Sequence, residues 1–596
     1  MSVAIGEVIA VRGVKITLRV FRDSNLEVVF DRGKRFKGLS IREHIAIRRG
    51  FKDIICVVEG EFLDEKMSDS SDTPAATSSY IRTVEVRPIG HLDHNGFAQG
   101  IKYLPMIKDH AFLISDDQVR EILSPSDDSD PSMGTLLKEG IAFRLPWRKL
   151  LNSHIGIFGN TGSGKSNTLA LMFTKLFDSM RERIGSKSKF VLVDFNGEYT
   201  SNQLTQDKAI FRLSTSGGGQ DKFPLDDAEF WNLDTLAILF QATPNTQRPF
   251  LSRLIDGRAR YLGNDSALTN YAKSAFKYAF SAARPKAEAL DLLRELSDRF
   301  GWGQVSDALR EISWHGAGRF FRARDGVYFN SEAEYLTHLD EVVALIDLRT
   351  LDSLDQLVAR AHIQLTRDIT SGFVQFEHIQ PLLKRIDASL LSLKKVLDVG
   401  DEFNAPNNNI LTVVSLKRCN SEIKKVVPLL LAKHYYNQQK DSVAQPPDKT
   451  LHLVIDEAHN ILSQQSVRES ESWKDYRVEL FEEIIKEGRK FGCFMTIASQ
   501  RPADISQTII SQLHNFFIHR LVNDRDLFLM ENTITTLDSL SRAMIPNLPK
   551  GCCVVTGIGF DIPLVVQMEY LDKGARPDSD DVDLEALWRG SNEDQA

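Results

Sequence analysis

The first sixty residues of the chain alternate apolar and polar positions in short runs that are separated by turn signals. The runs are GEVIAVRG, KITLRVF, LEVVF, HIAIRRG and DIICVVEGEF. Short strands at this regular spacing predict a small barrel or sandwich. We assign a β-barrel domain to residues 1–133 and expect its two acidic stretches, 64–79 and 124–132, to be solvated loops.

A different pattern follows, in which buried strands alternate with helical segments. The apolar strands are Ile155–Phe158, a run that ends at Phe195, Ile410–Leu416, Leu451–Glu457 and Phe494–Ser499. This alternation predicts a mainly parallel sheet that is covered by helices on both faces. The α/β core is therefore assigned to residues 134–222 and 407–572.

A long stretch between the two parts of this core has a helical pattern. Its segments include DTLAILFQA, RPFLSRLIDGRARYL and HIQPLLKRIDASLLSLKKVLD. The stretch is too long for an ordinary crossover, so we predict a helical insertion at residues 223–406. Residues 573–596 form an acidic tail in which only LEALW favours a short helix.

Composition narrows the class of protein. The chain has 596 residues, 73 basic and 81 acidic, and a net charge of -8, which excludes a histone-like protein that binds nucleic acid by bulk charge. The apolar runs are shorter than the roughly 18 residues of a membrane helix, and the start lacks a signal peptide's apolar block. The five cysteines lack disulfide or metal spacing, which is typical of a reducing compartment. We expect a cytoplasmic protein without a membrane partner.

The strongest chemical signal is the sequence GNTGSGKS at 159–166, between the strand Ile155–Phe158 and an amphipathic helix. This is the phosphate loop G-x-x-x-x-G-K-S, in which glycines let backbone N–H groups face the phosphates of a nucleotide. Lys165 is expected to reach the β- and γ-phosphates and Ser166 to bind Mg²⁺. The predicted nucleotide-binding residues are Gly159, Asn160, Thr161, Gly162, Ser163, Gly164, Lys165, Ser166 and Asn167. The alternative is a chance glycine-rich turn.

Two adjacent carboxylates end the strand in LVIDEAHN. Asp456 is predicted to be a Mg²⁺ ligand, and Glu457 to orient and deprotonate a water for attack on the γ-phosphate. Hydrolysis needs this second acid, whereas simple nucleotide binding does not. An exposed acidic loop after a strand is the alternative.

Three further signals leave their alternatives open. Gln500, at the end of FMTIASQ, could sense the γ-phosphate, or it could be a polar strand end. Arg489 follows an amphipathic helix and could enter a neighbouring subunit's site, or it could be a solvated helix end. Asp194 and Glu198 in VDFNGEY could shape the nucleotide pocket or the subunit contact, or they could form a structural turn.

Two basic stretches contain aromatic residues and suit contact with nucleic acid. They are RGKRFK at 32–37, with Arg48, Arg49 and Lys52 nearby, and RFFRAR at 319–324. Basic side chains contact phosphates and aromatic rings stack on bases. Solvated surface is the alternative for each.

The motifs GNTGSGKS, DFNGEY, DEAHN, EGRKFG and SQRP occur in the order of the HerA family of hexameric DNA translocases, within the HerA and FtsK class of P-loop ATPases. The chain resembles this family over about residues 2–60, 140–200 and 410–570. The resemblance implies a RecA-like α/β P-loop NTPase fold with a small amino-terminal β-barrel, ATP and Mg²⁺ as cofactors, and a homo-hexamer. It also implies translocation on, or unwinding of, double-stranded DNA together with a nuclease partner.

The resemblance assigns roles residue by residue. Lys165 and Ser166 match the nucleotide loop, Asp456 and Glu457 the acidic pair, Gln500 the sensor and Arg489 the trans-acting finger. The other candidates for the finger are Arg501, Arg520 and Arg525. Some HerA-like proteins resemble parts of antiviral modules that contain a nuclease or a NAD-consuming effector. The alternative function is therefore an ATPase scaffold that activates an effector without processive movement on DNA.

Overall fold

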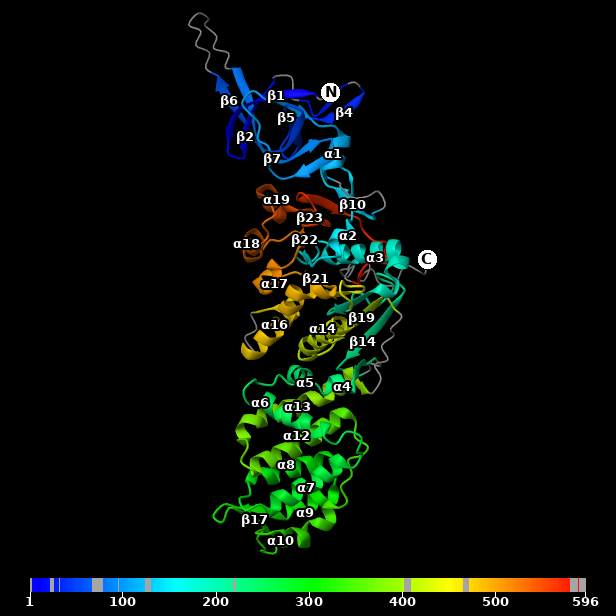
Figure 1. Cartoon of the computed structure of the whole chain (residues 1–596), viewed down its shortest axis with the longest axis vertical. Helices are drawn as coiled ribbons and strands as arrows, with labels where there is room; N and C mark the ends of the chain where they lie inside the picture. Colours follow the sequence, from blue (N-terminus) through cyan, green and yellow to red (C-terminus); the bar gives the residue numbers. More distant parts are fainter. Residues whose placement is uncertain are drawn as a thin grey trace, which may run out of the picture. The chain divides into compact units, whose positions relative to one another are not determined.

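The structure is a computed structural model that describes residues 3–21, 26–31, 33–66, 79–94, 96–123, 130–217, 221–400, 409–464, 471–578 and 588. Its contacts divide the chain into two compact units (Figure 1). The first unit comprises Met1–Arg183, Asn202–Thr205 and Phe494–Ala596, and the second comprises Ile184–Ser201 and Gln206–Cys493. The described residues leave out most of the two predicted acidic loops and most of the acidic tail. Residues 584–587 of the predicted LEALW helix are among those left out.

The first unit begins with a closed barrel of six strands, which confirms the predicted small β-barrel. The strands are β1 (Ala4–Arg12), β2 (Lys15–Val20), β5 (His44–Arg49), β6 (Lys52–Lys66), β7 (Ser79–Asp93) and β9 (His110–Leu113). Their order is β2-β1-β9-β5-β6-β7, and antiparallel pairing of β7 with β2 closes the ring. Alternate positions such as Ile16, Leu18, Ile45 and Ile47 are fully buried, so the apolar face of each strand lines one core.

Shorter elements complete the barrel region and lead into the core. They are β3 (Val28–Asp31), β4 (Lys34–Lys37), β8 (Gly96–Gln99), α1 (Asp116–Leu123), β10 (Ser132–Leu136), β11 (Ala142–Arg144) and α2 (Trp147–Leu150).

The rest of the first unit is one part of the α/β core. Its strand order is β11-β10-β24-β23-β22-β12-β21. The new strands are β12 (Ile155–Phe158), β21 (Cys493–Ser499), β22 (Asn515–His519), β23 (Cys552–Gly557) and β24 (Leu564–Met568). β12 is parallel to β21 and β22, and the strands beyond β22 are antiparallel. The helices are α3 (Lys165–Ile184), α17 (Gln507–Ser511), α18 (Asp524–Thr533) and α19 (Ser539–Met544).

The second unit holds four further core strands, all parallel, in the order β20-β13-β19-β14. They are β13 (Ser188–Asp194), β14 (Lys208–Ser214), β19 (Leu411–Arg418) and β20 (Thr450–Ile455), and α14 (Ile423–Ser442), α15 (His459–Leu462) and α16 (Glu471–Glu487) accompany them. The predicted mainly parallel α/β fold is confirmed. β14 was not predicted, because Lys208 and Arg212 interrupt its short apolar pattern.

The remainder of the second unit is the predicted helical insertion. Its helices are α4 (Asp227–Phe230), α5 (Leu233–Leu239), α6 (Gln247–Ala259), α7 (Ala267–Ser281), α8 (Ala287–Arg299), α9 (Gly303–Arg310), α10 (Glu332–His338), α11 (Asp340–Val343), α12 (Ser353–Thr370) and α13 (Phe376–Val396). β15 (Phe223–Asp226) pairs in parallel with β18 (Leu397–Gly400), so the two ends of the insertion lie side by side.

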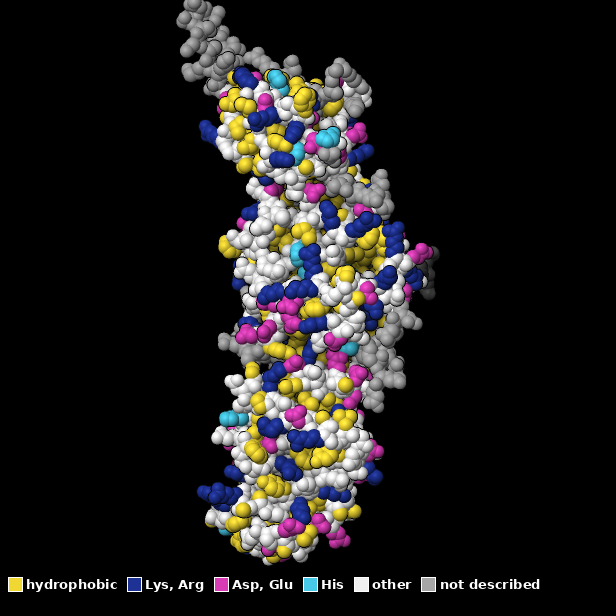
Figure 2. Space-filling view, in the orientation of Figure 1, with side chains coloured by type: hydrophobic (Ala, Val, Ile, Leu, Met, Phe, Trp, Pro, Cys, Tyr) yellow, Lys and Arg dark blue, Asp and Glu magenta, His cyan; other side chains and the backbone are white. Residues whose placement is uncertain are grey.

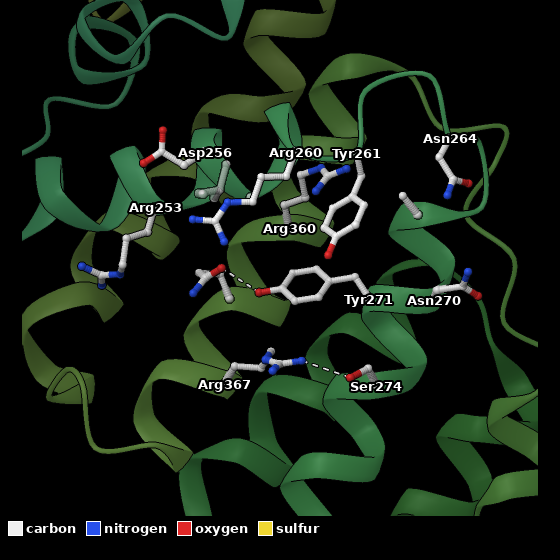
Figure 3. A pocket seen from close by; sticks show the side chains of 14 residues that line it. Arg253, Asp256, Arg260, Tyr261, Asn264, Asn270, Tyr271, Ser274, Arg360 and Arg367 are labelled. Carbon is white, nitrogen blue, oxygen red and sulfur yellow. Dashed lines mark hydrogen bonds between the residues drawn. The ribbon is translucent and has the colours of Figure 1, made fainter.

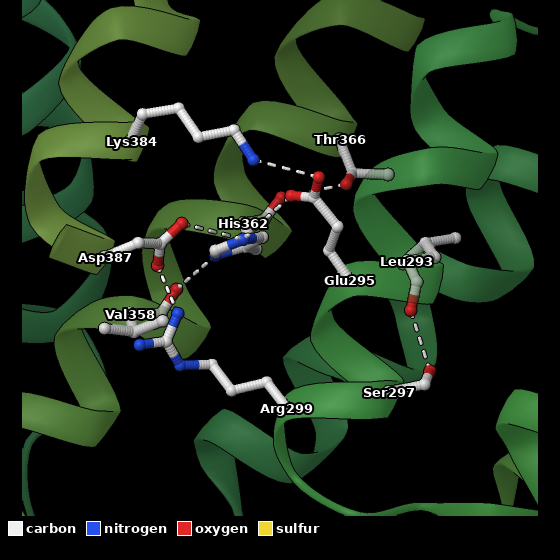
Figure 4. Close-up of polar contacts among 9 residues, drawn as sticks. All are labelled: Leu293, Glu295, Ser297, Arg299, Val358, His362, Thr366, Lys384 and Asp387. Atoms are coloured by element: carbon white, nitrogen blue, oxygen red, sulfur yellow. Dashed lines mark hydrogen bonds and ion pairs between the residues drawn. The ribbon is translucent and has the colours of Figure 1, made fainter.

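An ionic cluster around the buried His362 joins three helices of the insertion (Figure 4). His362 of α12 is 2% exposed at its side chain, and its Nε2 lies 3.8 Å from carboxylate oxygens of both Glu295 on α8 and Asp387 on α13. Lys384 pairs with Glu295 and Arg299 with Asp387. Because each carboxylate has its own cation, the charges in this cluster are balanced by the protein itself.

Two further sequence predictions can be compared with the structure. All five cysteines are buried and unbonded, and Cys552 and Cys553 lie in β23. No helix among the described residues is both long and apolar enough to cross a membrane.

Candidate functional site

The sequence GNTGSGKS forms a loop between β12 and α3. β12 is buried along its whole length, and α3 starts at Lys165, so the loop ends at the amino terminus of a 20-residue helix. Gly162 and Gly164 have φ values of +73° and +113°, which side chains other than glycine rarely adopt. A Cβ on Gly164 would also lie 2.9 Å from the Cα of Gly551. The loop therefore requires these glycines for its shape.

Neighbouring strand ends fix the loop. The Asn160 N–H donates to the carbonyl of Arg520 at 3.0 Å, and the Gly551 N–H donates to the carbonyl of Ser163 at 2.9 Å. The Asn167 side chain donates to the carbonyl of Glu569 at 2.9 Å. Lys165 is 4% exposed. The loop is thus held in one conformation by contacts that do not involve a ligand, which reduces the entropy lost on binding one.

Gln500 lies against this loop. It follows β21, which pairs in parallel with β12, and its side-chain carbonyl accepts a hydrogen bond from the Thr161 hydroxyl. Parallel strands end at the same edge of a sheet, which explains why two residues far apart in the sequence meet here. The structure therefore brings together Gln500 and the predicted nucleotide-binding loop, and the sensor role of Gln500 stays a prediction.

His519 is a residue at this loop that the sequence analysis missed. It ends β22, is fully buried, and its Cβ would lie 2.5 Å from a Cβ on Gly159. Burial, and then the nearby charge of Lys165, lower the pKa of His519 to about 4. The imidazole is therefore neutral at physiological pH and adds no positive charge beside Lys165. A lone histidine at a strand end gives no motif that could have identified it.

The acidic pair follows β20 in the second unit. Asp456 is 1% and Glu457 4% exposed, which excludes the alternative of an exposed acidic loop. Oδ1 of Asp456 accepts from the Glu457 N–H at 2.9 Å, and Oδ2 accepts from the Tyr199 hydroxyl at 3.3 Å. Glu457 has a φ of +48°. A residue other than glycine in this region costs about 1–3 kcal/mol, a strain that is concentrated at functional sites.

The sequence DFNGEY positions Tyr199 beside this pair. Asp194 at the end of β13 is fully buried, and its carboxylate accepts from the N–H groups of Asn196, Gly197, Glu198 and Tyr199 at 2.7–3.2 Å. Burial raises the pKa of Asp194, and these backbone hydrogen bonds oppose that shift. Asp194 therefore holds the turn, and the turn carries Tyr199 to Asp456. The contacts of Asp194 therefore support its role in a structural turn.

Arg489 lies in a 3-10 turn, Gly488–Phe491, directly after α16. Its side chain is exposed, and no hydrogen bond or ion pair of its guanidinium group is present among the described residues. Arg501, Arg520 and Arg525 are exposed as well. Burial alone therefore does not separate the four candidates for a trans-acting arginine.

Two of the basic residues near the first basic stretch are engaged within the barrel. Arg48 pairs with Asp53 at 2.9 Å and lies over the ring of Phe112, and Lys52 lies 3.8 Å from the centre of the Tyr103 ring. Arg32 lies outside the described residues. These contacts favour the solvated-surface alternative.

The second basic stretch belongs to a hairpin of β16 (Ile312–His315) and β17 (Phe320–Ala323). Phe321 is fully buried there, and Arg324 pairs with Glu311 at 3.1 Å. On the face shown in Figure 2, basic side chains are interspersed with acidic ones.

Comparison with known proteins agrees with these features. A family model described as the central domain of helicase HerA matches residues 132–364. The probable DNA double-strand break repair helicase HerA of Methanocaldococcus jannaschii is 20% identical over 551 residues, which cover 89% of this chain and 94% of that protein. The DNA double-strand break repair helicase HerA of Sulfurisphaera tokodaii is 26% identical over 449 residues, or 74% of this chain and 70% of that protein.

Among solved structures, VirB4 of Thermoanaerobacter pseudethanolicus matches 75% of this chain and 99% of its own, with 13% identity and a TM-score of 0.41.

A phosphate loop between a buried strand and a helix, in a core of mainly parallel strands, defines the chain as a P-loop ATPase. Within this class, the chain is similar to helicase HerA, whose central-domain model matches residues 132–364 and whose relatives named above are 20–26% identical to it.

Proposed function

We propose that the chain forms a homo-hexameric ring that couples ATP hydrolysis to movement on double-stranded DNA. The observation that carries this proposal is the buried pair Asp456 and Glu457, with Glu457 held at positive φ, in a chain that also has a complete phosphate loop. Several relatives are named as DNA double-strand break repair helicases. Their names support DNA as the polymer on which the ring acts.

The phosphate loop and the acidic pair suit two different tasks in ATP hydrolysis, which are binding of the phosphates and activation of the attacking water. The loop N–H groups and Lys165 would bind the phosphates, and the carboxylate of Glu457 would orient a water and accept its proton. His459 supports this role, because its Nδ1 lies 3.3 Å from Oε2 of Glu457 and can help to fix the orientation of the carboxylate. Gln500, from its place beside Thr161, would contact the γ-phosphate or the attacking water.

Ser166 and Asp456 are the residues that we propose to hold Mg²⁺. A hydroxyl and a carboxylate are hard oxygen ligands of the kind that Mg²⁺ prefers. Asp456 accepts a hydrogen bond at each oxygen, and a carboxylate oxygen can accept more than one bond. When bound, Mg²⁺ would neutralise charge on the phosphates.

The proposed motor differs from the alternative function in its use of movement on DNA. We propose that a nuclease or a NAD-consuming effector works with the ring. The alternative function, a scaffold that activates such an effector, differs in needing no movement on DNA.

The deciding experiment measures ATPase activity with and without a DNA duplex. It also measures whether the protein displaces a third strand that is bound to the duplex as a triplex. The motor should show DNA-stimulated hydrolysis and ATP-dependent displacement. Lys165→Ala should abolish both, because phosphate binding is lost. A lysine that lies elsewhere on the same helix, Lys175, gives the control Lys175→Ala. Hydrolysis that DNA does not change, without any displacement, would contradict the motor and leave the scaffold.

A further inference from the structure

The helical insertion contains a pocket of about 570 Å³ between α6, α7 and α12 (Figure 3). This volume lies within the range of roughly 300–1,000 Å³ that is typical of small-molecule sites. Four arginines line the pocket, Arg253, Arg260, Arg360 and Arg367, and the only acidic side chain of the lining is that of Asp256. The pocket is therefore strongly positive.

Arg360 is the most unusual of these residues. It is 8% exposed, and among the described residues its guanidinium group has no ion pair, while its buried Nε has no hydrogen-bond acceptor. Burial, and then the charge of Arg258, lower the pKa of Arg360 to about 10, so the side chain remains charged at neutral pH. A buried charge without a partner is costly, and an anion in the pocket would remove that cost.

The other arginines divide into one that is neutralised and two that are not. Arg253 donates to Asp368 at 2.8 Å. Arg367 donates to the Ser274 hydroxyl at 3.0 Å and lies 5.5 Å from the centre of the Tyr271 ring. Neither partner is negatively charged, and within the described part of the chain no carboxylate pairs with Arg367. Arg260 is exposed, and none of the described acidic residues pairs with it. Three guanidinium groups are thus left for an anionic ligand.

Two further features of the same pocket indicate what kind of anion it would bind. Ala267, the first residue of α7, lines the pocket, so the positive end of that helix dipole adds to the arginines. Tyr261 borders the pocket and is 60% exposed, and the amide side chains of Asn264 and Asn270 lie in the same lining. An aromatic face with amide groups suits a planar heterocycle, and arginines suit phosphates.

We propose that this pocket binds a free nucleotide, with its phosphates on Arg260, Arg360 and Arg367 and its base against Tyr261. The site is a second one, because no residue of the GNTGSGKS loop belongs to it. It gives the insertion a function of its own, as a place where a nucleotide can bind independently of hydrolysis.

The test counts the ADP molecules that bind per chain, by equilibrium dialysis, in four proteins. Wild type should bind two, and Lys165→Ala and Arg360→Met should each bind one. The double variant should bind none. Two molecules bound by Arg360→Met, or none by Lys165→Ala alone, would overturn the proposal. If Lys165→Ala binds two and Arg360→Met one, the pocket stands and the assignment of the loop fails.

Control variants separate loss of the ligand from loss of the fold. Arg324→Met, in the same insertion, should leave binding unchanged, because Arg324 is an exposed residue outside the pocket. Arg260→Met removes an exposed pocket charge and should weaken ADP at this site by at least tenfold, the loss expected for one charged hydrogen bond. An Arg260→Met protein that binds ADP as wild type does would contradict the assigned phosphate contacts, even if Arg360→Met fails to fold.

Two competitors identify the class of ligand in the Lys165→Ala protein. Inorganic pyrophosphate should compete at least tenfold more weakly than unlabelled ADP, because it lacks the base. Equal competition would overturn the contact with Tyr261. A single-stranded oligonucleotide that displaces ADP at lower concentration than ADP itself would overturn the proposal in favour of a nucleic-acid site.

Discussion

The acidic pair after β20 and Arg360 in the pocket of the insertion are both buried charged groups, but their charges have different surroundings. Each oxygen of Asp456 accepts a hydrogen bond, from Tyr199 or from the backbone of Glu457. Arg360, by contrast, has no carboxylate partner among the described residues. The protein itself therefore supplies hydrogen-bond donors to the acidic pair, while an anionic ligand is what we propose to balance the charge of Arg360.

The His362 cluster shows what charge balance without a ligand looks like in the same insertion. Glu295 and Asp387 are each paired with a cation, and His362 lies between them. The comparison therefore distinguishes three arrangements: a hydrogen-bonded acidic pair, a pocket with an uncompensated arginine and a cluster in which each carboxylate has its own cation. The following predictions test these assignments.

The largest effect is expected for Arg489→Ala, which tests whether a neighbouring subunit completes the acidic site. If Arg489 is the trans-acting arginine, its loss should lower the ATPase rate by about 10³-fold. Mixing Arg489→Ala with Glu457→Gln under conditions of subunit exchange should restore part of the activity, because some interfaces regain both groups.

A mixture that stays inactive, together with a linear loss of activity when either variant is added to wild type, would remove Arg489 from this role. Arg501 or Arg520 would then be the next candidate. Arg324→Ala, on the exposed hairpin of the insertion, is the matched control.

The next effect concerns the turn that carries Tyr199. Asp194→Asn replaces a carboxylate that accepts four backbone N–H groups with an amide that has only one oxygen. We expect the free energy of unfolding of the second unit to fall by about 2–3 kcal/mol, the usual size for charged hydrogen bonds. Urea unfolding monitored by circular dichroism measures this change. An unchanged midpoint would show that the turn does not depend on the charge, and the exposed Asp265→Asn gives the control.

A smaller and pH-dependent effect is expected at the balanced cluster. The nearby His362, followed by the hydrogen bond from Lys384, lowers the pKa of Glu295 from 4.5 to about 2. A carboxyl group whose pKa is lowered in the folded state stabilises the fold above its unfolded pKa, and this stability is lost as the pH falls through 4.5 to about 2. After allowance for solvent screening, the contribution is about 1 kcal/mol.

Glu295→Gln should remove this acid dependence, as measured by thermal unfolding between pH 5 and pH 2 in wild type and variant. Two equal pH profiles would contradict the assignment of the cluster as structural.

The structure also shows which parts of the molecule could be predicted from local sequence. The phosphate loop and the acidic pair lie within a few residues of a buried strand, so their chemistry and position follow from one segment each. The strand β14 and the hairpin β16–β17 were missed, because their charged positions resemble solvated surface. His519 meets the loop only through the pairing of β22 with β12.

The arginine pocket could not have been predicted from a motif. Arg260, Tyr271 and Arg360 belong to three helical regions that lie far apart in the sequence, and only the packing of α6, α7 and α12 brings them together. In the sequence, each of these arginines is indistinguishable from a solvent-exposed residue of a helix. That none of the described carboxylates pairs with Arg360 becomes visible only when its neighbours in space are known.

The most direct test of the central claim is the behaviour of Glu457→Gln. The substitution removes the proposed base and leaves Asp456 and the loop in place, so ATP should bind with nearly wild-type affinity and hydrolysis should be lost. Glu483→Gln, which changes the same charge at an exposed position of α16, should hydrolyse ATP normally. A single-turnover measurement with labelled ATP distinguishes the outcomes. Bound ATP that stays intact in Glu457→Gln is the predicted result, and hydrolysis at the wild-type rate would contradict the assignment of the acidic pair.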